Sequence, residues 1–370
     1  MEKERSPKFS KPNFIQPEGS MVPPATPQGA ILDEAPALVD ESALKDAEDK
    51  KKKSQTPLSE SLRRLRHDKR AVVCFTVIVL YILVAVFGPF IYTHIGADYK
   101  SDISNTTISS TIYRDFTHQE PDRKHEGPSA QYWLGTDSIG RDLFSRLMQG
   151  MLISISVAVI VEIIDIVVGV AVGVLAGYYG GWIDFFLARF TDVMFAFPGI
   201  LFLILLVGIL GPRIDTLSNI PVIGANGNAR LVLVSLGLAV TVWPTMARYV
   251  RGQTLQLKEQ QFIEAARTSG ASDLIIILRH LVPNLLSIVI IASTLNIANT
   301  IISEAGISLL GLGVQPPGSS IGLMISDATS YMQYHPWEAL MPAIVLIIIV
   351  LAFSFLGDGL RDAFDPRSKD

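Results

Sequence analysis

Six long apolar runs constrain the fold of this chain more than any other feature. The first run, residues 71–91, contains no charged side chain, and a helix of ~20 residues spans the ~30 Å hydrocarbon core of a bilayer. The other five runs cover residues 152–176, 193–211, 231–249, 285–308 and 337–357. Helices satisfy their backbone hydrogen bonds within one segment, and none of these runs alternates like a barrel strand. The sequence therefore predicts an all-α integral membrane protein with six transmembrane helices.

Basic residues beside the apolar runs predict how the chain is oriented. They gather before the first run, in the loop between the fourth and fifth runs and at the C-terminus, whereas residues 311–336 contain no Lys or Arg. Because basic loops tend to stay on the cytoplasmic side, we expect both termini and the 250–283 loop to be cytoplasmic. The first transmembrane helix then places residues 92–150 outside the cytoplasm.

Composition divides the chain into four parts. Residues 1–60 combine prolines and mixed charges with few large apolar side chains, which predicts a disordered cytoplasmic tail. Residues 61–91 are expected to form a juxtamembrane segment and the first transmembrane helix, and residues 92–150 an extracytoplasmic loop that ends in an interfacial helix. Residues 151–370 complete the five-helix transmembrane core. The one cysteine, Cys74, lies in the first apolar run, so no disulfide can form within the chain.

The end of the extracytoplasmic segment, WLGTDSIGRDLFSRLMQG, has the pattern of an amphipathic helix. Thr136 or Asp137 can cap its first turn. One face carries apolar side chains at helical spacing and the other carries two i,i+4 charge pairs: Ile139, Leu143, Phe144 and Leu147, and the pairs Asp137–Arg141 and Asp142–Arg146. We expect this helix to lie along the outer membrane surface and to lead into the second span.

The basic loop between the fourth and fifth runs has the pattern of two short helices rather than of a simple connection. The first helix is expected at about Thr254–Ser269, and Gly270 suits the left-handed position that ends a helix. Ser272 can cap a second short helix, with Asp273 favourable in its first turn. Pro283 is expected to break that second helix before the fifth span.

Three residues near the end of the first short helix give this unit the character of a docking element. Ala265 and Ala266 let another surface approach closely, and Glu264 offers one negative charge to an arginine of a partner. The alternative is a re-entrant hairpin that packs on its own bundle. The residues alone leave both interpretations open.

Polar side chains also occur inside the apolar runs, where lipid offers them no partner. In the fifth run Asn296, Thr300 and Ser303 recur at i, i+4 and i+7, with Asn299 and Glu304 beside them. Such a stripe is expected to face protein or water rather than lipid. It indicates either a translocation path or hydrogen bonds between helices of the bundle, and both interpretations stay open.

The second run contains two carboxylates, Glu162 and Asp165, near its middle. Each costs roughly 2.5–3.5 kcal/mol on insertion scales, so we expect them to be protonated or paired with a partner subunit. A proton relay at these residues would indicate a proton-coupled secondary transporter. A membrane-anchored scaffold with no transport role is another alternative, but a scaffold would not need the polar stripe of the fifth run.

Several motifs together resemble a known family. EAARTSG followed by RHLVPN is similar to the EAA loop of permease subunits in bacterial ABC importers, and RGQTLQLK precedes it. SLLGLGVQPP, GDGLRDAFDPR and LGTDSIGRDLFSR also look like motifs of the second permease subunit of oligopeptide and dipeptide importers. The resemblance covers about residues 60–370. Glu162 and Asp165 depart from it, since the family usually has apolar residues at this depth.

The resemblance implies a function and a set of partners. The EAA loop would form the coupling helix, with Glu264, Ala265, Ala266 and Gly270 contacting a separate ATP-hydrolysing subunit. A second homologous permease, two ATP-binding subunits and an extracytoplasmic solute-binding protein would complete an importer of oligopeptides or dipeptides in the bacterial cytoplasmic membrane. Nickel or another small solute stays an alternative substrate, because relatives that carry such solutes share these motifs.

The sequence contains no pattern typical of an enzyme site. The phosphate-binding motif G-x-x-x-x-G-K-[ST] does not occur, so energy for transport would come from another chain. The six histidines show no H-E-x-x-H spacing, and no nucleophile elbow is present. We therefore expect no catalytic residue, no cofactor and no metal site, with membrane lipid and peptide rather than nucleic acid as partners.

Overall fold

The computed structural model describes residues 63–100, 107–215 and 228–364. All of them belong to one compact unit, Gln55–Asp370. The predicted tail of residues 1–60 lies outside the described residues, so its expected disorder stays a prediction.

Five described helices are long and apolar enough to cross a membrane. A sixth crossing exists if two shorter helices, which meet at a bend of 76°, count as one broken span. The five are α3 (Lys69–His94), α5 (Leu143–Tyr179), α8 (Asn228–Leu257), α11 (Val282–Leu309) and α13 (Pro336–Phe364), and the bent pair is α6 (Gly181–Ala196) and α7 (Gly199–Asp215).

The bend corrects the expectation of one helix over residues 193–211. Pro198 lies between the two helices, and Phe197 before it has an extended backbone with φ −76° and ψ 128°. Proline disfavours helical backbone at the residue before it, so α6 ends at Ala196 and α7 begins at Gly199. The apolar run predicted helix in this part of the chain but not the break between α6 and α7.

Small residues bring α5 and α8 into close contact. Gly169, Gly173 and Gly177 follow one another at i, i+4 and i+8 on α5. A Cβ added at Gly173 would lie 2.6 Å from the carbonyl oxygen of Ala247, and one at Gly177 would lie 2.7 Å from Cβ of Thr254. Membrane helices have no hydrophobic drive to associate, so close packing at small residues stabilises the pair.

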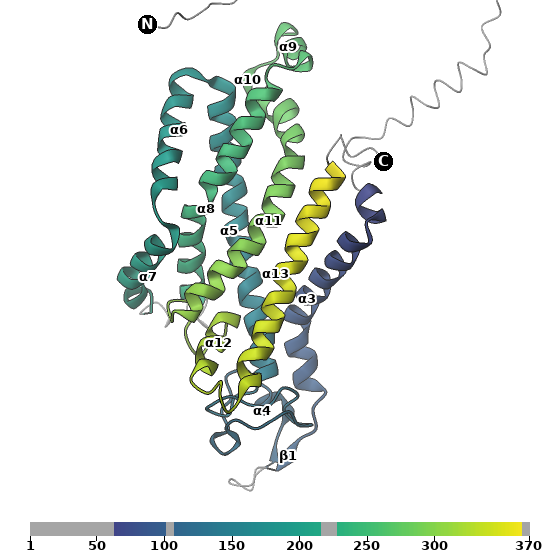
Figure 1. The fold of residues 1–370 in the computed structure, drawn as a ribbon, viewed down its shortest axis with the longest axis vertical. Coiled ribbons are helices and arrows are strands. Elements are labelled where there is room, and N and C mark those ends of the chain that lie inside the picture. Colours follow the sequence, from purple (N-terminus) through teal and green to yellow (C-terminus); the bar gives the residue numbers. More distant parts are fainter. Residues whose placement is uncertain (1–62, 101–106, 216–227, 365–370) are drawn as a thin grey trace, which may run out of the picture. The chain divides into compact units, whose positions relative to one another are not determined.

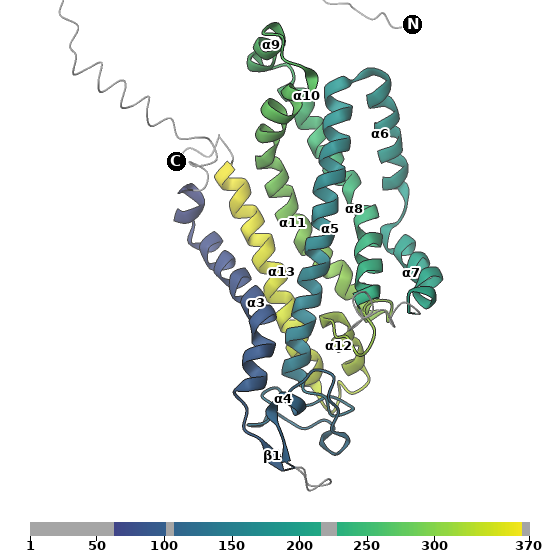
Figure 2. The same ribbon diagram turned by 180° about the vertical axis from the view of Figure 1, so that it is seen from behind.

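Large apolar side chains cover outward faces of the spans. Phe75, Phe87 and Phe90 of α3 are 58%, 56% and 69% exposed. The helices α3 and α6 lie on opposite flanks of the bundle (Figure 1 and Figure 2), and α6 likewise exposes Phe186 and Phe190. Soluble proteins rarely expose so much apolar surface, so these faces are suited to contact with lipid.

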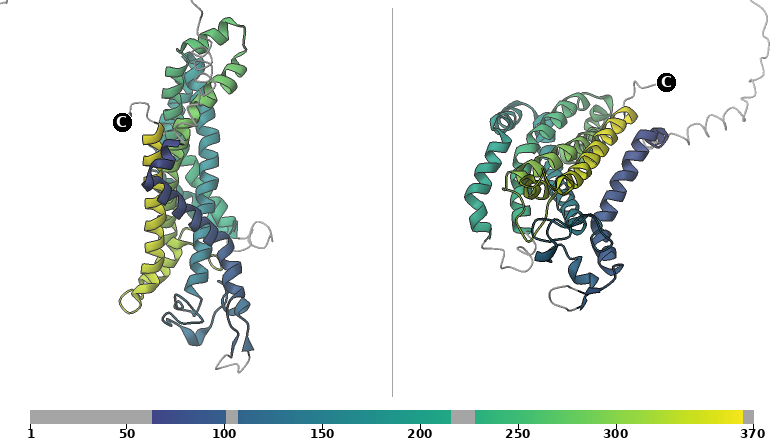
Figure 3. Two further views of the ribbon diagram at one scale, coloured as in Figure 1. Left: turned by 90° about the vertical axis from the view of Figure 1, so that its right-hand side faces the viewer. Right: turned by 60° about the horizontal axis from the view of Figure 1, so that its bottom comes forward.

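The two ends of the bundle carry different structures (Figure 1 and Figure 3). We call them the α9 end and the α4 end. The α9 end carries α9 (Gln261–Thr268) and α10 (Asp273–Ile275). The α4 end carries the antiparallel strands β1 (Tyr99–Lys100) and β2 (Thr107–Ile108), the short helices α4 (Ser110–Tyr113) and η1 (Pro121–Arg123), and α12 (Ile321–Thr329).

The structure corrects the expected start of the first short helix at the α9 end. Thr254 belongs to α8, so the first short helix is α9 alone and not Thr254–Ser269. Gly270 has φ +81°, which confirms the predicted left-handed position. Ser272 precedes α10 as expected, but its side chain makes no capping hydrogen bond.

Pro283 does not break the second helix. A π-helical segment, η4 (Ile276–Leu281), joins α10 to α11, and Pro283 lies in the first turn of α11. The wider turn pairs the Val282 N–H with the Ile277 carbonyl, and Asn284 Nδ2 donates to the His280 carbonyl at 2.6 Å. Proline has no N–H to donate, and these two bonds give nearby backbone carbonyls other donors. The helix therefore continues past Pro283 without a break.

The expected interfacial helix before the second span does not form. Asp142, rather than Thr136 or Asp137, caps the helix: its Oδ1 accepts from the backbone N–H of Phe144 at 2.8 Å and of Ser145 at 3.3 Å. The preceding residues form a tight turn closed by a bridge between Thr136 and Asp142. Ile139 therefore lies outside the helix, and α5 runs unbroken from Leu143 to Tyr179.

Candidate functional site

The loop at the α9 end has a buried face and a free face. Ile263 is fully buried and packs in an apolar cluster with Tyr178, Ile276 and Leu281. Ala266 packs against the same cluster and is half-buried. The exposed residues are the other three that the sequence predicted for docking: Glu264, Ala265 and Gly270. The structure thus separates Ala266, which supports α9 from within, from the residues that are free to meet another chain.

Three interactions tether this loop to the spans. The Tyr178 hydroxyl at the end of α5 donates to Asp273 Oδ1 at 2.6 Å, and the Arg267 guanidinium lies 5.3 Å from the centre of the Tyr178 ring. Lys258 Nζ donates to the Gly177 carbonyl at 3.0 Å. Sequence reasoning missed Tyr178, because nothing in the local pattern pairs it with a residue about ninety positions later.

The two carboxylates of the second span have a partner within the chain. Asn296 Nδ2 on α11 donates to Glu162 Oε2 at 3.0 Å and to Asp165 Oδ2 at 3.3 Å. The expected pairing with another subunit is therefore not the only way to satisfy them. Among the described residues, Glu162 Oε1, Asp165 Oδ1 and the Ser293 hydroxyl are buried without a hydrogen-bond partner.

The predicted stripe on α11 divides into three environments. Asn296 joins the carboxylates, and Thr300 is buried close to it along the helix. Asn299 is exposed, and the Ser303 hydroxyl turns back to the Asn299 carbonyl at 2.8 Å. Glu304 is 1% exposed and accepts from two serine hydroxyls, of Ser154 at 2.8 Å and Ser308 at 2.7 Å. Hydrogen bonding between helices thus explains part of the stripe, while Asn299 stays free on the surface of α11.

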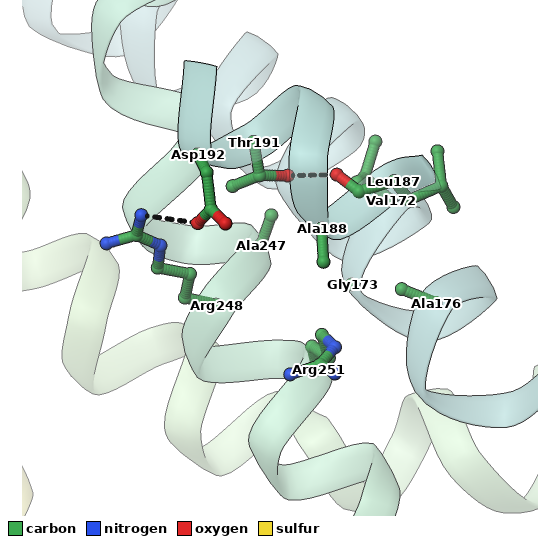
Figure 4. A pocket seen from close by; sticks show the side chains of 10 residues that line it. All are labelled: Val172, Gly173, Ala176, Leu187, Ala188, Thr191, Asp192, Ala247, Arg248 and Arg251. Carbon is green, nitrogen blue, oxygen red and sulfur yellow. Dashed lines mark hydrogen bonds and ion pairs between the residues drawn. The ribbon is translucent and has the colours of Figure 1, made fainter. Parts of the chain in front are cut away.

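A cavity of about 340 Å³ lies between α5, α6 and α8 (Figure 4). Two arginines of α8 line it, and each binds an aspartate of α6. Arg248 Nη2 donates to Asp192 Oδ1 at 2.9 Å, and Arg251 donates to both carboxylate oxygens of Asp184 at 2.5 and 2.7 Å. These pairs hold the first half of the broken span against α8, so the arginines serve a structural role in this arrangement.

A network of charged side chains fixes the start of α5 at the α4 end. Asp137 Oδ2 accepts from Arg141 Nε and from Arg146 Nη1, both at 2.7 Å, and Arg146 also reaches Asp327 of α12 at 3.1 Å. The expected Asp137–Arg141 pair is therefore present, although it is buried and not on a helix. The expected Asp142–Arg146 pair was wrong, because Asp142 caps α5 and Arg146 turns to Asp137.

Asp142 itself has an unusual environment. Its Oδ2 accepts a hydrogen bond from the Tyr92 hydroxyl at 2.8 Å. Burial raises the pKa of Asp142 to about 6, although the hydrogen bonds from Tyr92 and the backbone oppose this shift. The contact links the end of α3 to the start of α5 and so connects the first two spans directly.

These features together define a class of protein. The chain has several lipid-suited spans, hydrogen-bonded polar groups inside them, and an anchored helix with a free face at one end. Such a combination is typical of a multi-pass subunit of a membrane transport system.

Comparison with known proteins identifies the family. Residues 169–370 match the model of the binding-protein-dependent transport system inner membrane component. Residues 56–106 match the N-terminal transmembrane domain of oligopeptide transport permease C. The chain belongs to the family of binding-protein-dependent inner-membrane permeases. It is a permease subunit of an importer and a multi-pass protein of the cytoplasmic membrane, which confirms the resemblance seen in its motifs.

Curated relatives match most of the chain. It is 42% identical over 315 residues to a glutathione transport system permease protein, GsiD, of Shigella flexneri serotype 5b, covering 85% of this chain and 92% of the relative. The GsiD protein of Escherichia coli O6:K15:H31 is 41% identical over the same length. A solved structure of the inward-facing methionine ABC transporter MetNI is 20% identical, with a TM-score of 0.45, covering 59% of this chain and 96% of that chain.

Proposed function

We propose that this permease subunit works in an ATP-driven importer of short peptides. It pairs with a second homologous permease, and the two together form the translocation path. Two ATP-binding subunits dock at the α9 end, which faces the cytoplasm. An extracytoplasmic solute-binding protein delivers peptide at the α4 end.

The main support for this proposal is that α9 has one buried face and one exposed face. Its inner face is fixed by the fully buried Ile263, while Glu264 and Ala265 are exposed on the same short helix. An anchored helix with a free face can transmit a push, because the anchoring side chains move with it. From α9 the chain continues through α10 and η4 into α11 without a proline break. A displacement of α9 by the ATP-binding subunits would therefore reach the span that carries the polar stripe.

The residues proposed for the translocation path lie on α11. Asn299 is exposed and Ser303, half-buried, lies one turn further along the same side, so both can face the second permease across the path. Thr300 is buried, and the half-buried Asn296 is held by the carboxylates of α5. We therefore assign peptide contact to Asn299 and Ser303 first. Asn296 and Thr300 would support that surface from behind.

The names of the relatives support a substrate class. Glutathione, which the GsiD relatives are named for, is a short peptide with several charges. A polar, uncharged stripe can hydrogen-bond the backbone of such a peptide without requiring one side chain. We propose oligopeptides or dipeptides as substrates, with nickel or another small solute as the alternative.

Transport by the purified complex tests this function. The complete importer would be placed in proteoliposomes, and uptake of labelled glutathione and of a labelled dipeptide would be followed with and without ATP. We expect uptake that requires ATP and the solute-binding protein and that continues when an ionophore collapses the proton gradient. Uptake that persists without ATP and stops with the ionophore would instead establish a proton-coupled carrier.

The proposed orientation has a direct test in intact cells. In a Cys74→Ala background, single cysteines would replace the exposed residues Ser269 at the α9 end and Asp122 at the α4 end. A membrane-impermeant thiol reagent added from outside should label Asp122→Cys and not Ser269→Cys. The opposite labelling pattern would invert the orientation.

A further inference from the structure

Two histidines and a glutamate from distant parts of the chain meet at the α4 end. His125 lies in the segment before α5, and its backbone has φ +53°. His335 lies just before α13, and Glu338 lies in the first turn of that helix. One ligand atom from each of these three residues lies within 4.8 Å of the others.

The three side chains are held closely together. His125 Nδ1 lies 2.6 Å from Glu338 Oε1, and the two imidazole rings stack with centres 4.2 Å apart and planes 7° apart. The Glu338 side chain is 2% exposed and the His125 side chain is 19% exposed. His335 Nδ1 is buried and has no hydrogen-bond partner among the described residues.

A simple hydrogen bond explains only part of this arrangement. It accounts for His125 and Glu338, which form a buried pair with good geometry. It does not account for His335, whose buried ring nitrogen carries the cost of a lost hydrogen bond with water. Two stacked imidazoles beside a carboxylate instead present the donor atoms that a transition metal ion takes up.

We propose that His125, His335 and Glu338 form a binding site for a divalent transition metal ion of the zinc class. Two imidazole nitrogens and one carboxylate oxygen are a known ligand set for zinc, which leaves a fourth position for water or a ligand. Calcium and magnesium are excluded as preferred ions because they favour all-oxygen sites. Ligands of a tetrahedral zinc ion lie about 3.3 Å apart, given bonds of ~2.0–2.1 Å. The ion would therefore push His125 Nδ1 and Glu338 Oε1, now 2.6 Å apart, slightly away from each other, and no two of the three ligand atoms are more than 4.8 Å apart.

An ion at this site would have a mechanical effect. It would clamp the extracytoplasmic segment around His125 to the start of α13, whose outer end carries the other two ligands. In the described part of the chain, these side chains are otherwise joined by the His125–Glu338 contact and by ring contacts of His125 with Tyr331 and His335. Metal binding would thus stiffen the face at which we propose that the solute-binding protein docks.

Metal binding to the purified importer tests the proposal. The full chain with its partner subunits would carry a Strep tag instead of a polyhistidine tag, be treated with a chelator and dialysed, and then be titrated with Zn²⁺ in a calorimeter. Co²⁺ absorption in the visible range gives a second readout of nitrogen and oxygen ligands. His335→Ala and Glu338→Gln remove one ligand each. His118→Ala is the matched control, because His118 also lies at the α4 end beside a carboxylate, Glu120, at 3.3 Å.

The outcomes separate a metal site from a hydrogen-bonded pair. We expect the wild type to bind one equivalent of Zn²⁺, and His335→Ala and Glu338→Gln to weaken binding about tenfold or more, while His118→Ala binds like the wild type. Assembly of the importer, followed by size-exclusion chromatography, shows that the variants fold. If the wild type takes up no Zn²⁺, or if His335→Ala binds as tightly as the wild type, the cluster is structural and the proposal is wrong. Peptide uptake is not used as the readout, so the test does not depend on the proposed function.

Discussion

The Tyr178 hydroxyl donates a hydrogen bond of 2.6 Å to Asp273 Oδ1, and this contact joins the end of α5 to the segment between α9 and α11. Tyr178 also belongs to the apolar cluster that buries Ile263. One side chain therefore contacts both halves of the loop. We infer that it keeps α9 and α10 moving together with the second span.

Tyr178→Phe is expected to uncouple ATP hydrolysis from uptake. The ring would still pack against Ile263, but the hydrogen bond to Asp273, worth about 0.5–1.5 kcal/mol net, would be lost. Because the exposed face of α9 is unchanged, the ATP-binding subunits should still co-purify. The number of peptides transported per ATP should fall in proteoliposomes. Tyr179→Phe, at the neighbouring exposed position, is the control, and an unchanged ratio in Tyr178→Phe would contradict the proposed link.

Gly270 offers a test of the backbone at the end of α9. No atom lies within 4 Å of a Cβ added there, and the backbone has φ +81°, so a substitution causes strain without a clash. Gly270→Val should cost about 1–2 kcal/mol because left-handed backbone is unfavourable for L-residues. Asparagine tolerates this conformation, so Gly270→Asn should keep uptake and co-purification of the ATP-binding subunits, while Gly270→Val lowers both. If the two variants have equal uptake and equal co-purification, the left-handed turn at Gly270 is not needed for docking of the ATP-binding subunits.

The carboxylates of the second span yield a third prediction, because Asn296 donates to both of them. The double variant Glu162→Gln, Asp165→Asn keeps acceptor oxygens for Asn296, and we expect normal uptake with an unchanged pH profile. The double leucine variant removes both acceptors, which should cost about 1–3 kcal/mol and lower the amount of protein in the membrane. Lost uptake and lost pH dependence in the Gln/Asn variant, at normal membrane levels, would favour proton coupling.

Apolar runs and turn residues were enough to predict much of the fold. The runs located the five helices that are long and apolar enough to cross a membrane and the bent pair α6–α7, because an uncharged stretch of this length has few alternatives to a membrane helix. Gly270 was predicted at a left-handed position for a local reason, the absence of a Cβ. Predictions of this kind depend on a few adjacent residues. Contacts with distant parts of the chain therefore do not change them.

The errors arose where distant residues decide the structure. The expected helix before the second span rested on Ile139 and on the spacing of charged residues. In the structure Arg146 instead forms ion pairs with Asp137 and with Asp327 of α12. Pro283 was expected to end a helix, and a π-helical turn instead accommodates it. His125 and His335 are separated by about two hundred residues, so no spacing motif could bring them together. The sequence showed the polar stripe of α11 but not which residues face inward.

We propose that the exposed face of α9 docks the ATP-binding subunits, and a substitution at Ala265 tests this role. Ala265 is exposed, so Ala265→Leu leaves packing within the chain unchanged, whereas Ala266→Leu would also crowd the cluster around Ile263. Overpacking a close contact costs typically about 1–3 kcal/mol. Asp362→Leu is the control. Asp362 is exposed in the last turn of α13, and this helix ends on the side of the bundle that carries α9 (Figure 1).

The measurement is the amount of ATP-binding subunit that co-purifies with the permease from membranes, divided by the amount of permease. We expect Ala265→Leu to lower this ratio by a factor of about 5 to 150, as 1–3 kcal/mol implies, and Asp362→Leu to leave it at the wild-type value. A wild-type ratio in Ala265→Leu, with permease present in normal amounts, would contradict the docking role of α9.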